Sequence, residues 1–567
     1  MFNPTERIKV LCICLSVIGC IATSAFSQDL ANLSAQKPFT LNGAVSLSTT
    51  GYSASGIPDR RDPFSWTIVG SPVASIYGVQ LPFSFIISEQ ERSFRQPFDQ
   101  FGISPQYKFI TLHLGYTSMN MSRYTMAGVT FLGAGIELTP NPLRFSAMYG
   151  RLQRAVEEDT TQQDNLPAYQ RMGYAVKLGF GTDAGYFDIN YFHAKDDSSS
   201  LSHAPVRADI TPSENSVLAL AAKVPILPQL SLDGEVAASL FTTDLRSPTL
   251  NLDSSSFPSI ITSLYDFHTS TSLTFAEHAD LNYNVPHFGI KLEYERIEPD
   301  FNSLGAYYFT TDIENWTIGP HFDVLDSKLR VGGSIGIQHD NILNTKAAQT
   351  QRLIGSANIS WNPAQIFGID AQYTNYSTDQ GSGRAPINDS IRARNVSQSM
   401  SLAPRLLLQS PDMNHSITLV TTYQQYTDLN AFTNALTNSQ TKMATVGYNL
   451  SFIQEAKSIG ISFLYSNTQS GGITTSVAGV NLNGSMNLVN NTITLGAGLG
   501  YTVTSVDLYS SSGNTITENI NGSYRVTKLD NIGLSLYATQ NSGNTTVASQ
   551  FQEITLTLNY THTFSFF

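Results

Sequence analysis

The carboxyl-terminal stretch alternates strictly between two kinds of side chain. One face carries apolar and aromatic residues with a single histidine: Ile554, Leu556, Leu558, Tyr560, His562, Phe564 and Phe566. The other face carries Thr555, Thr557, Asn559, Thr561, Thr563 and Ser565. This period of two is typical of a β-strand with one apolar face. A soluble protein seldom leaves such a strand at a sheet edge, because unpaired backbone groups beside an apolar stripe promote aggregation. In a transmembrane β-barrel the last strand pairs with the first, and the apolar face meets lipid.

The same alternation recurs far from the terminus. Clear examples are Leu329–Ile337, Val446–Phe452, Ile459–Tyr465 and Ile493–Val503, each with Gly, Ser, Thr or Asn on the second face. Only 13% of residues are charged, against roughly 25% in globular domains. Uncharged polar residues take their place, as expected of a barrel with a polar lumen.

Short groups rich in Pro, Asn and Asp divide the chain at fairly even intervals. They are Asn141-Pro142, Thr182-Asp183, Leu227-Pro228, Val285-Pro286, Asp326-Ser327, Asn362-Pro363, Pro411-Asp412, Glu455-Ala456, Asn490-Asn491 and Leu529-Asp530. Each interval holds two strand-like segments around a longer polar stretch, the asymmetry of short periplasmic turns and long external loops. Four strands are expected before them, at Phe39–Tyr52, Ser65–Phe85, Tyr107–Thr117 and Ala127–Leu138. The sequence therefore predicts an all-β fold, a transmembrane antiparallel β-barrel of about 24 strands, within a range of about 22 to 26.

The amino terminus has the pattern of an export signal. Arg7 and Lys9 precede an apolar run, and Ala25-Phe26-Ser27 fits the small-x-small cleavage rule. The alternative is a lipoprotein box that ends at Cys20. We expect a signal peptide at 1–27, a short periplasmic segment at 28–38 and the barrel at 39–567. Nothing later approaches the ~18 apolar residues of a membrane helix.

Several classes of chemistry find no support. The three cysteines, Cys12, Cys14 and Cys20, all lie in the signal, so a mature protein would have no thiol for a disulfide or a metal. The tightest group of metal-ligand types is Glu277-His278-Ala279-Asp280, and on a strand Glu277 and Asp280 face opposite sides. We expect no catalytic residue, no cofactor and no metal, and hence no enzyme. A net charge of -12 without Lys/Arg clusters argues against nucleic acid.

Charged residues of the first third are the candidates for lining the lumen, because Arg or Lys on the lipid face costs roughly 2–4 kcal/mol. The candidates are Arg60, Arg61, Glu91, Arg92, Arg95, Lys108, Arg144, Arg151 and Arg171. An inward arginine cluster would favour anions, whereas a solvated loop is the plainer interpretation for Arg60, Arg61, Arg123 and Arg154. Aromatic residues near strand ends, such as Trp316 and Trp361, favour an interfacial girdle over a sugar-stacking ladder.

The segment 88–106 is a candidate for filling the lumen. Its Glu89–Phe101 stretch combines charges with three phenylalanines and, on the expected strand map, lies at the periplasmic side. A loop or short helix at the barrel rim is the alternative. Long external loops such as Thr242–Ser270 are the other candidates for this role, from the opposite end.

The export signal, the alternating strands, the turn asymmetry and the terminus resemble the bacterial outer-membrane β-barrel superfamily of porins and related transporters. The resemblance implies an assembly signal at Tyr560, Phe564, Phe566 and Phe567, read by the barrel-assembly machinery, with Phe567 as one extra residue. It also implies a place in the outer membrane, in contact with outer-membrane lipid and lipopolysaccharide. We expect a porin-like or partly plugged channel for a small polar solute. The alternatives are a surface barrel that serves as scaffold or receptor in secretion or adhesion, and a barrel enzyme.

Overall fold

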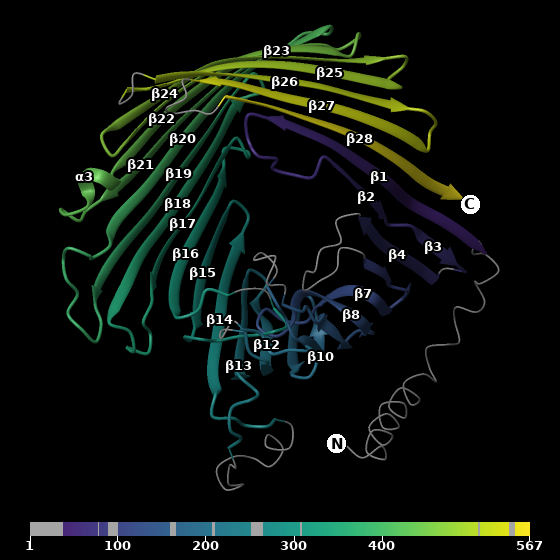
Figure 1. Cartoon of the computed structure of the whole chain (residues 1–567), viewed down its shortest axis with the longest axis vertical. Helices are drawn as coiled ribbons and strands as arrows, with labels where there is room; N and C mark the ends of the chain where they lie inside the picture. The colour runs from purple at the N-terminus through teal and green to yellow at the C-terminus, as the bar shows by residue number, and fades with distance from the viewer. Residues whose placement is uncertain are drawn as a thin grey trace.

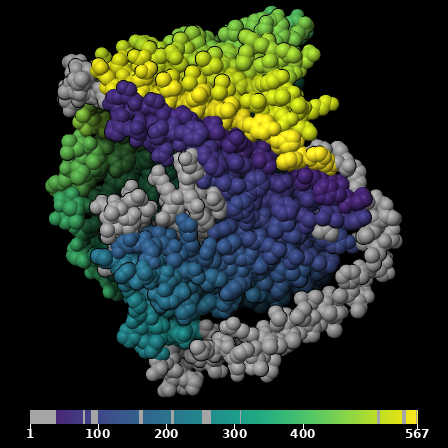
Figure 2. Space-filling model, turned by 45° about the vertical axis from the view of Figure 1, so that its right-hand side comes forward, coloured from purple at the N-terminus to yellow at the C-terminus, as the bar shows by residue number. Residues whose placement is uncertain are grey.

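The first and last strands pair and close the sheet into a ring. The structure is a computed structural model that describes residues 38–77, 79–88, 100–158, 166–206, 210–250, 265–306, 309–507, 511–543 and 550–566. β1 and β28 are antiparallel from Leu41↔Phe566 to Ser55↔Gln552. Figure 2 shows this seam, where the purple first strand lies against the yellow last strand. All other strand pairs of the sheet are antiparallel as well (Figure 1).

The elements are β1 (Phe39–Ser55), β2 (Phe64–Gly70), β3 (Val73–Ile76), β4 (Val79–Ser88), β5 (Gln100–Ile103), β6 (Gln106–Tyr107), β7 (Ile110–Asn120), β8 (Ala127–Leu138), β9 (Leu143–Gln153), β10 (Gln170–Thr182), β11 (Gly185–Asp197), β12 (Glu214–Leu227), β13 (Leu230–Thr242), β14 (Thr271–Val285), β15 (Phe288–Ile297), β16 (Ile313–Val324), β17 (Leu329–His339), β18 (Ala348–Ala364), β19 (Phe367–Ser382), β20 (Arg394–Gln409), β21 (Met413–Asp428), α3 (Asn434–Thr437), β22 (Ser439–Phe452), β23 (Lys457–Ser470), β24 (Ile473–Leu488), β25 (Ile493–Val506), β26 (Ser511–Arg525), β27 (Asp530–Gly543) and β28 (Phe551–Phe566).

In the described part of the chain, these 28 strand segments occupy 26 positions around the ring. β2 and β3 are two halves of one position, since both pair with β1 on one side and with β4 on the other. β5 and β6 likewise share the position between β4 and β7. The all-β barrel is thus confirmed, and the count lies at the upper end of the expected range.

The difference from about 24 strands arises wholly before β9. The segment Ser65–Phe85, expected to be one strand, is two antiparallel strands that turn at Tyr77, whose φ is 47°. The sequence marks that turn with Gly78 alone, without the Pro, Asn or Asp that mark most of the later turns. Gln100–Tyr107 adds the second missed position. From Asn141 onward, all ten expected turns fall at or within two residues of the strand junctions.

The extra strands place the connection between β4 and β5 at the opposite edge of the barrel from the one expected. β4 ends and β5 begins at the same edge as the long loops, because β3 and β4 meet at the short-turn edge. The periplasmic-side placement of Glu89–Phe101 is therefore wrong. Residues 89–99 lie outside the described residues, and Gln100–Ile103 is part of the barrel wall.

The two faces of the sheet differ in chemistry. On β11 and β12, Phe187, Ile189, Leu218 and Leu220 are exposed on the outer face, whereas Asn190 is buried on the inner one. Apolar residues exposed around the outside would aggregate in water but are stable against lipid. The protein is a membrane-spanning β-barrel with the architecture of bacterial outer-membrane proteins. Among the described residues, no helix is long and apolar enough to cross a membrane.

Candidate functional site in the barrel lumen

The inner wall falls into two chemically different halves. On β18 to β28 and β1 it is mostly hydroxyl, amide and glycine, as in the row Asn481, Gly500 and Thr517 across β24, β25 and β26. On β9 to β15 it carries many ionisable groups. Cross-strand partners share a face of the sheet, so the register identifies these groups. They are Arg144, Lys177, Asp188, Lys223, Asp233, Glu235, His278, Asp280, Lys291, Glu293 and Glu295.

Five carboxylates of this wall gather on three adjacent strands, β13, β14 and β15. Asp233, Asp280 and Glu293 form one cross-strand row, and Glu235 and Glu295 flank His278 in the next. The Lys291 ammonium lies 3.0 Å from Asp280 Oδ2 and 2.8 Å from Glu293 Oε2. Among the described residues, no group of three or more His, Cys, Asp or Glu could hold a metal ion. Glu277 lies on the outer face, opposite His278 and Asp280.

The loop 121–126, between β7 and β8, folds inward and docks on this acidic wall. Glu235 Oε2 accepts a hydrogen bond from the backbone N–H of Arg123 at 3.1 Å, and Oε1 accepts one from that of Tyr124 at 3.2 Å. The Arg123 guanidinium forms an ion pair with Glu295. The Tyr124 ring is fully buried, with centroids 5.7 Å from both His278 and Phe301. A carboxylate thus satisfies two loop amides that would otherwise be buried without partners.

The loop 298–312, between β15 and β16, packs beside the first. Asn215 on β12 is fully buried. Its Oδ1 accepts a hydrogen bond from the Leu304 N–H at 3.0 Å, and its Nδ2 donates one to the Asn302 carbonyl at 3.3 Å. Ser303 Oγ donates to the Thr125 carbonyl at 2.7 Å, which ties the two loops together. These contacts make the two loops one docked unit.

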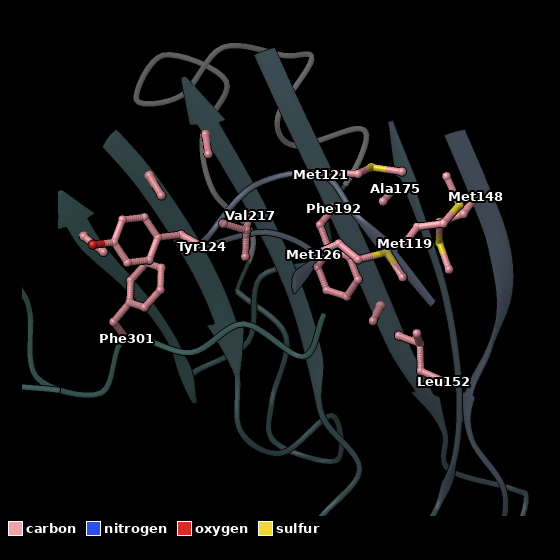
Figure 3. Packing of buried hydrophobic residues seen from close by; sticks show 14 of the residues in the cluster. Met119, Met121, Tyr124, Met126, Met148, Leu152, Ala175, Phe192, Val217 and Phe301 are labelled. Carbon is pink, nitrogen blue, oxygen red and sulfur yellow. The ribbon is translucent and has the colours of Figure 1, made fainter. Parts of the chain in front are cut away.

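An apolar cluster lies under the docked loops. It includes Met119, Met121 and Met126 from the first loop and its flanks, together with Met148, Leu152, Phe192 and Val217 from the wall. Figure 3 shows these side chains gathered on the inner face of the strands, with Phe301 beside Tyr124. A hydrophobic core inside a barrel is possible only where loops cover it, since water would otherwise fill the space. The docked loops therefore narrow the lumen from the long-loop side.

The far end of the second loop is held by an ion pair. Lys346 Nζ, in the loop between β17 and β18, lies 2.5 Å from Asp312 Oδ2, and Asp312 Oδ1 accepts from the Ile342 N–H at 3.0 Å. Burial raises the pKa of the Asp312 carboxyl, but hydrogen bonds from Lys346, Ile342 and Asn341 outweigh it, so the net pKa is below its ordinary value of 3.8.

Two of the expected lumen arginines face inward, and both are neutralised. Arg144 Nε lies 3.0 Å from Asp188 Oδ1, and its guanidinium stacks 4.4 Å from the Tyr186 ring centroid. Arg171 Nε and Nη2 donate to Asp196 at 2.7 and 2.9 Å. Each of these two arginines has its own carboxylate, so they do not form an unpaired cationic cluster of the kind that would favour anions.

The other candidates do not join this wall. Arg60 and Arg61 lie in the loop between β1 and β2, where Arg60 Nη1 is 3.1 Å from Glu553 Oε2 and Arg61 stacks on Tyr52. Lys108 lies in the short turn between β6 and β7. Arg151 points outward, where Nη2 donates to Tyr116 Oη at 3.0 Å. Glu91, Arg92 and Arg95 lie outside the described residues.

The terminal residues stand in the closing seam. Tyr560 Oη donates to Asp530 Oδ1 at 2.7 Å, and the Phe564 ring packs 4.7 Å from that of His562. Phe566 pairs with Leu41 of β1, and Phe567 lies outside the described residues. The role of these residues as an assembly signal stays a prediction.

The sequence contains one signal for the docking loop. Three of the ten methionines, Met119, Met121 and Met126, fall within eight residues, at a connection where polar residues would be usual. Methionine adapts to irregular apolar gaps, so its density at a loop indicates burial. Nothing comparable marks Glu235 or Asn215, whose partners lie 111 and 89 residues away.

Known proteins resemble the chain only in broad architecture. No family model matches it, and no curated protein matches. Among solved structures, Pseudomonas aeruginosa OccK7 (OpdD) covers 94% of this chain and 100% of its own at 10% identity, with a TM-score of 0.30. The FrpB iron transporter from Neisseria meningitidis covers 92% and 81% at 10% identity, with a TM-score of 0.38. Acinetobacter baumannii OccAB3 covers 69% and 99% at 11% identity, with a TM-score of 0.30. At such values no residue role is transferred.

Proposed function

We propose that the protein is a passive outer-membrane channel for small polar solutes, partly plugged by the docked loops 121–126 and 298–312. The observation that carries this proposal is the inner wall itself, which is mostly polar on the described strands outside the region that those two loops cover. A ring of 26 strands is wider than the 16–18-stranded porins that already enclose an aqueous channel. The loops would restrict a lumen that is otherwise wide enough to leak. The proposal includes no catalytic step.

The charges of the wall support a preference for cations. On β13 to β15, the five carboxylates Asp233, Glu235, Asp280, Glu293 and Glu295 face the cations Lys291 and Arg123. The inward arginines contribute little, because Arg144 and Arg171 each have a carboxylate partner. A wall with surplus negative charge raises the local concentration of cations along the path.

Planar-bilayer recording of the purified protein tests this function. We expect discrete conductance steps. In a salt gradient, the sign of the reversal potential should show that cations pass more readily than anions. Selectivity should weaken as salt rises, because the Debye length falls from about 10 Å at 0.1 M to about 3 Å at 1 M. A correctly assembled, heat-modifiable protein without conductance would rule out the channel.

One observation favours a second candidate, a surface barrel that binds a partner protein. Ile391, Phe432 and Leu436 lie on the loops after β19 and β21 and are 74%, 73% and 77% exposed. Asn430 Nδ2 donates to the carbonyls of Asp389 and Arg392, both at 3.0 Å, which fixes one loop against the other. A pre-ordered apolar surface costs little entropy on binding. Loss of adhesion or secretion in a Phe432→Ser, Leu436→Ser variant with unchanged conductance would support this candidate.

Export and insertion complete the proposal. We infer that 1–27 is a cleaved signal, that β28 is read by the barrel-assembly machinery, and that the outer face contacts outer-membrane lipid and lipopolysaccharide. Residues 1–37 lie outside the described residues. Mass spectrometry of the mature protein would report whether cleavage follows Ser27 or whether Cys20 is lipidated.

A further inference from the structure

A cavity of about 620 Å³ opens on the lumen side at the long-loop mouth. Its walls are residues of 300–306 with Phe309 and Thr311 from the loop between β15 and β16, the ends of β13 and β14 on the long-loop side, and Arg171 of β10. Small-molecule sites commonly have volumes of about 300–1,000 Å³. A solute that enters the proposed channel from this end would pass the cavity.

One wall of the cavity is aromatic and rigid. The Phe301 and Phe309 rings lie 5.8 Å apart at 69°, and Phe241 of β13 adds a third ring to the lining. Both loop rings also pack on Tyr124, at 5.7 and 5.8 Å, and Tyr124 is fully buried. Phe301 is 3% exposed and serves mainly as the packing partner of Phe309. Phe309 and Phe241 are half-buried, so these two rings can offer apolar faces to a ligand with little entropy cost on binding.

The lining also supplies polar groups that could hydrogen-bond to a ligand. Among the described residues, the hydroxyls of Thr243 and Thr311 and the carboxylate of Asp300 have no hydrogen-bond or ion-pair partner. Arg171, in contrast, is fully engaged with Asp196 and Ser213. In the described part of the chain, Asp300 has no ion pair within 4 Å, although Lys346 interacts with it electrostatically, so its carboxylate is the charged group of the lining that a ligand could still contact.

We propose that this cavity is a binding site for a small saccharide, neutral or amino-substituted, which it retains at the mouth of the lumen. Sugars present apolar C–H faces to aromatic rings and hydroxyls to polar side chains, and both kinds of residue line this cavity. A purely apolar ligand would leave Asp300 and the threonines without partners, and an acidic sugar would be repelled by Asp300. The inference rests on the proposed channel for its biological meaning, but the site can be tested without any transport.

Calorimetric titration of the full-length protein in detergent, with glucose, glucosamine and glucuronate as probes, tests the site. We expect glucosamine to bind most tightly and glucuronate most weakly. Asp300→Asn should weaken glucosamine about tenfold, because a charge-assisted hydrogen bond is lost, and should change glucose by less than about threefold. Phe309→Ala should weaken both sugars.

Matched controls exist for both variants. Asp326→Asn makes the same change at a residue with the same left-handed backbone, φ 54° against 61° for Asp300, but at the short-turn edge. Phe432→Ala removes a ring from another external loop. Both controls should bind like the wild type. Equal affinity for glucuronate and glucosamine, or no binding of either glucose or glucosamine, would overturn the site. Sugar binding without conductance would instead overturn the channel and leave the site standing.

Discussion

The docking of loop 121–126 depends on one carboxylate, Glu235, and its replacement by glutamine tests the plug directly. Glu235 is 5% exposed and accepts two backbone N–H groups through its two oxygens. Glutamine keeps one acceptor and turns an NH₂ group toward the other N–H. A hydrogen bond to a charged group contributes about 1.5–3 kcal/mol, so the docking equilibrium should shift by about tenfold to a hundredfold.

Glu235→Gln should raise the mean single-channel conductance and the current noise, because the loop leaves the wall more often. Glu293→Gln is the matched control. Glu293 faces the same lumen from β15, two strands away from Glu235, and loses the same charge, but it pairs with Lys291 and not with the loop. The barrel hydrogen bonds are untouched in both variants, so heat-modifiability should stay as in the wild type.

A chemical reporter can follow the loop without any current. All three cysteines lie at or before position 20, so Met121→Cys would supply the sole thiol after signal removal. Met121 is 6% exposed when docked. Its labelling by a water-soluble maleimide should speed up about tenfold in the Glu235→Gln background. Equal conductance and equal labelling in the Glu235→Gln and Glu293→Gln backgrounds would show that the docked loop does not narrow the pore.

Two further predictions concern the seam and the second loop. Removal of Phe564–Phe567 should prevent assembly, because an open seam leaves backbone groups of β1 unpaired in lipid; heat-modifiable protein at wild-type levels would contradict this. The pKa of Asp312 is depressed below 3.8 in the folded protein, so its contribution to loop docking is complete above that value and is lost as the pH falls through the lower folded pKa. At low pH the loop should undock and the conductance should rise. Lys346→Met should shift the midpoint of this transition to a higher pH, toward the ordinary carboxyl pKa. An unchanged pH profile would show that the Lys346–Asp312 ion pair does not hold the second loop.

The sequence alone was sufficient for the barrel from Asn141 onward. Period-two alternation and turn chemistry are local properties, so each strand and each short turn such as Asn490-Asn491 could be located from a few neighbouring residues. Local information failed before β9, at the turn beside Tyr77 and at Gln100–Tyr107, and these two failures hid two strands. The first of them also placed the next connection at the wrong edge.

The content of the lumen was decided by tertiary structure. Arg144 and Arg171 looked like free cations in the sequence, and only strand register brings Asp188 and Asp196 beside them. Glu89–Phe101 was one candidate for the plug, and its residues 89–99 lie outside the described residues. The loops that the structure shows docked inside are held by distant partners such as Glu235, which lies 111 residues from Tyr124. Alternation assigns a side chain to a face, but which loop covers that face depends on long-range contacts that no local pattern encodes.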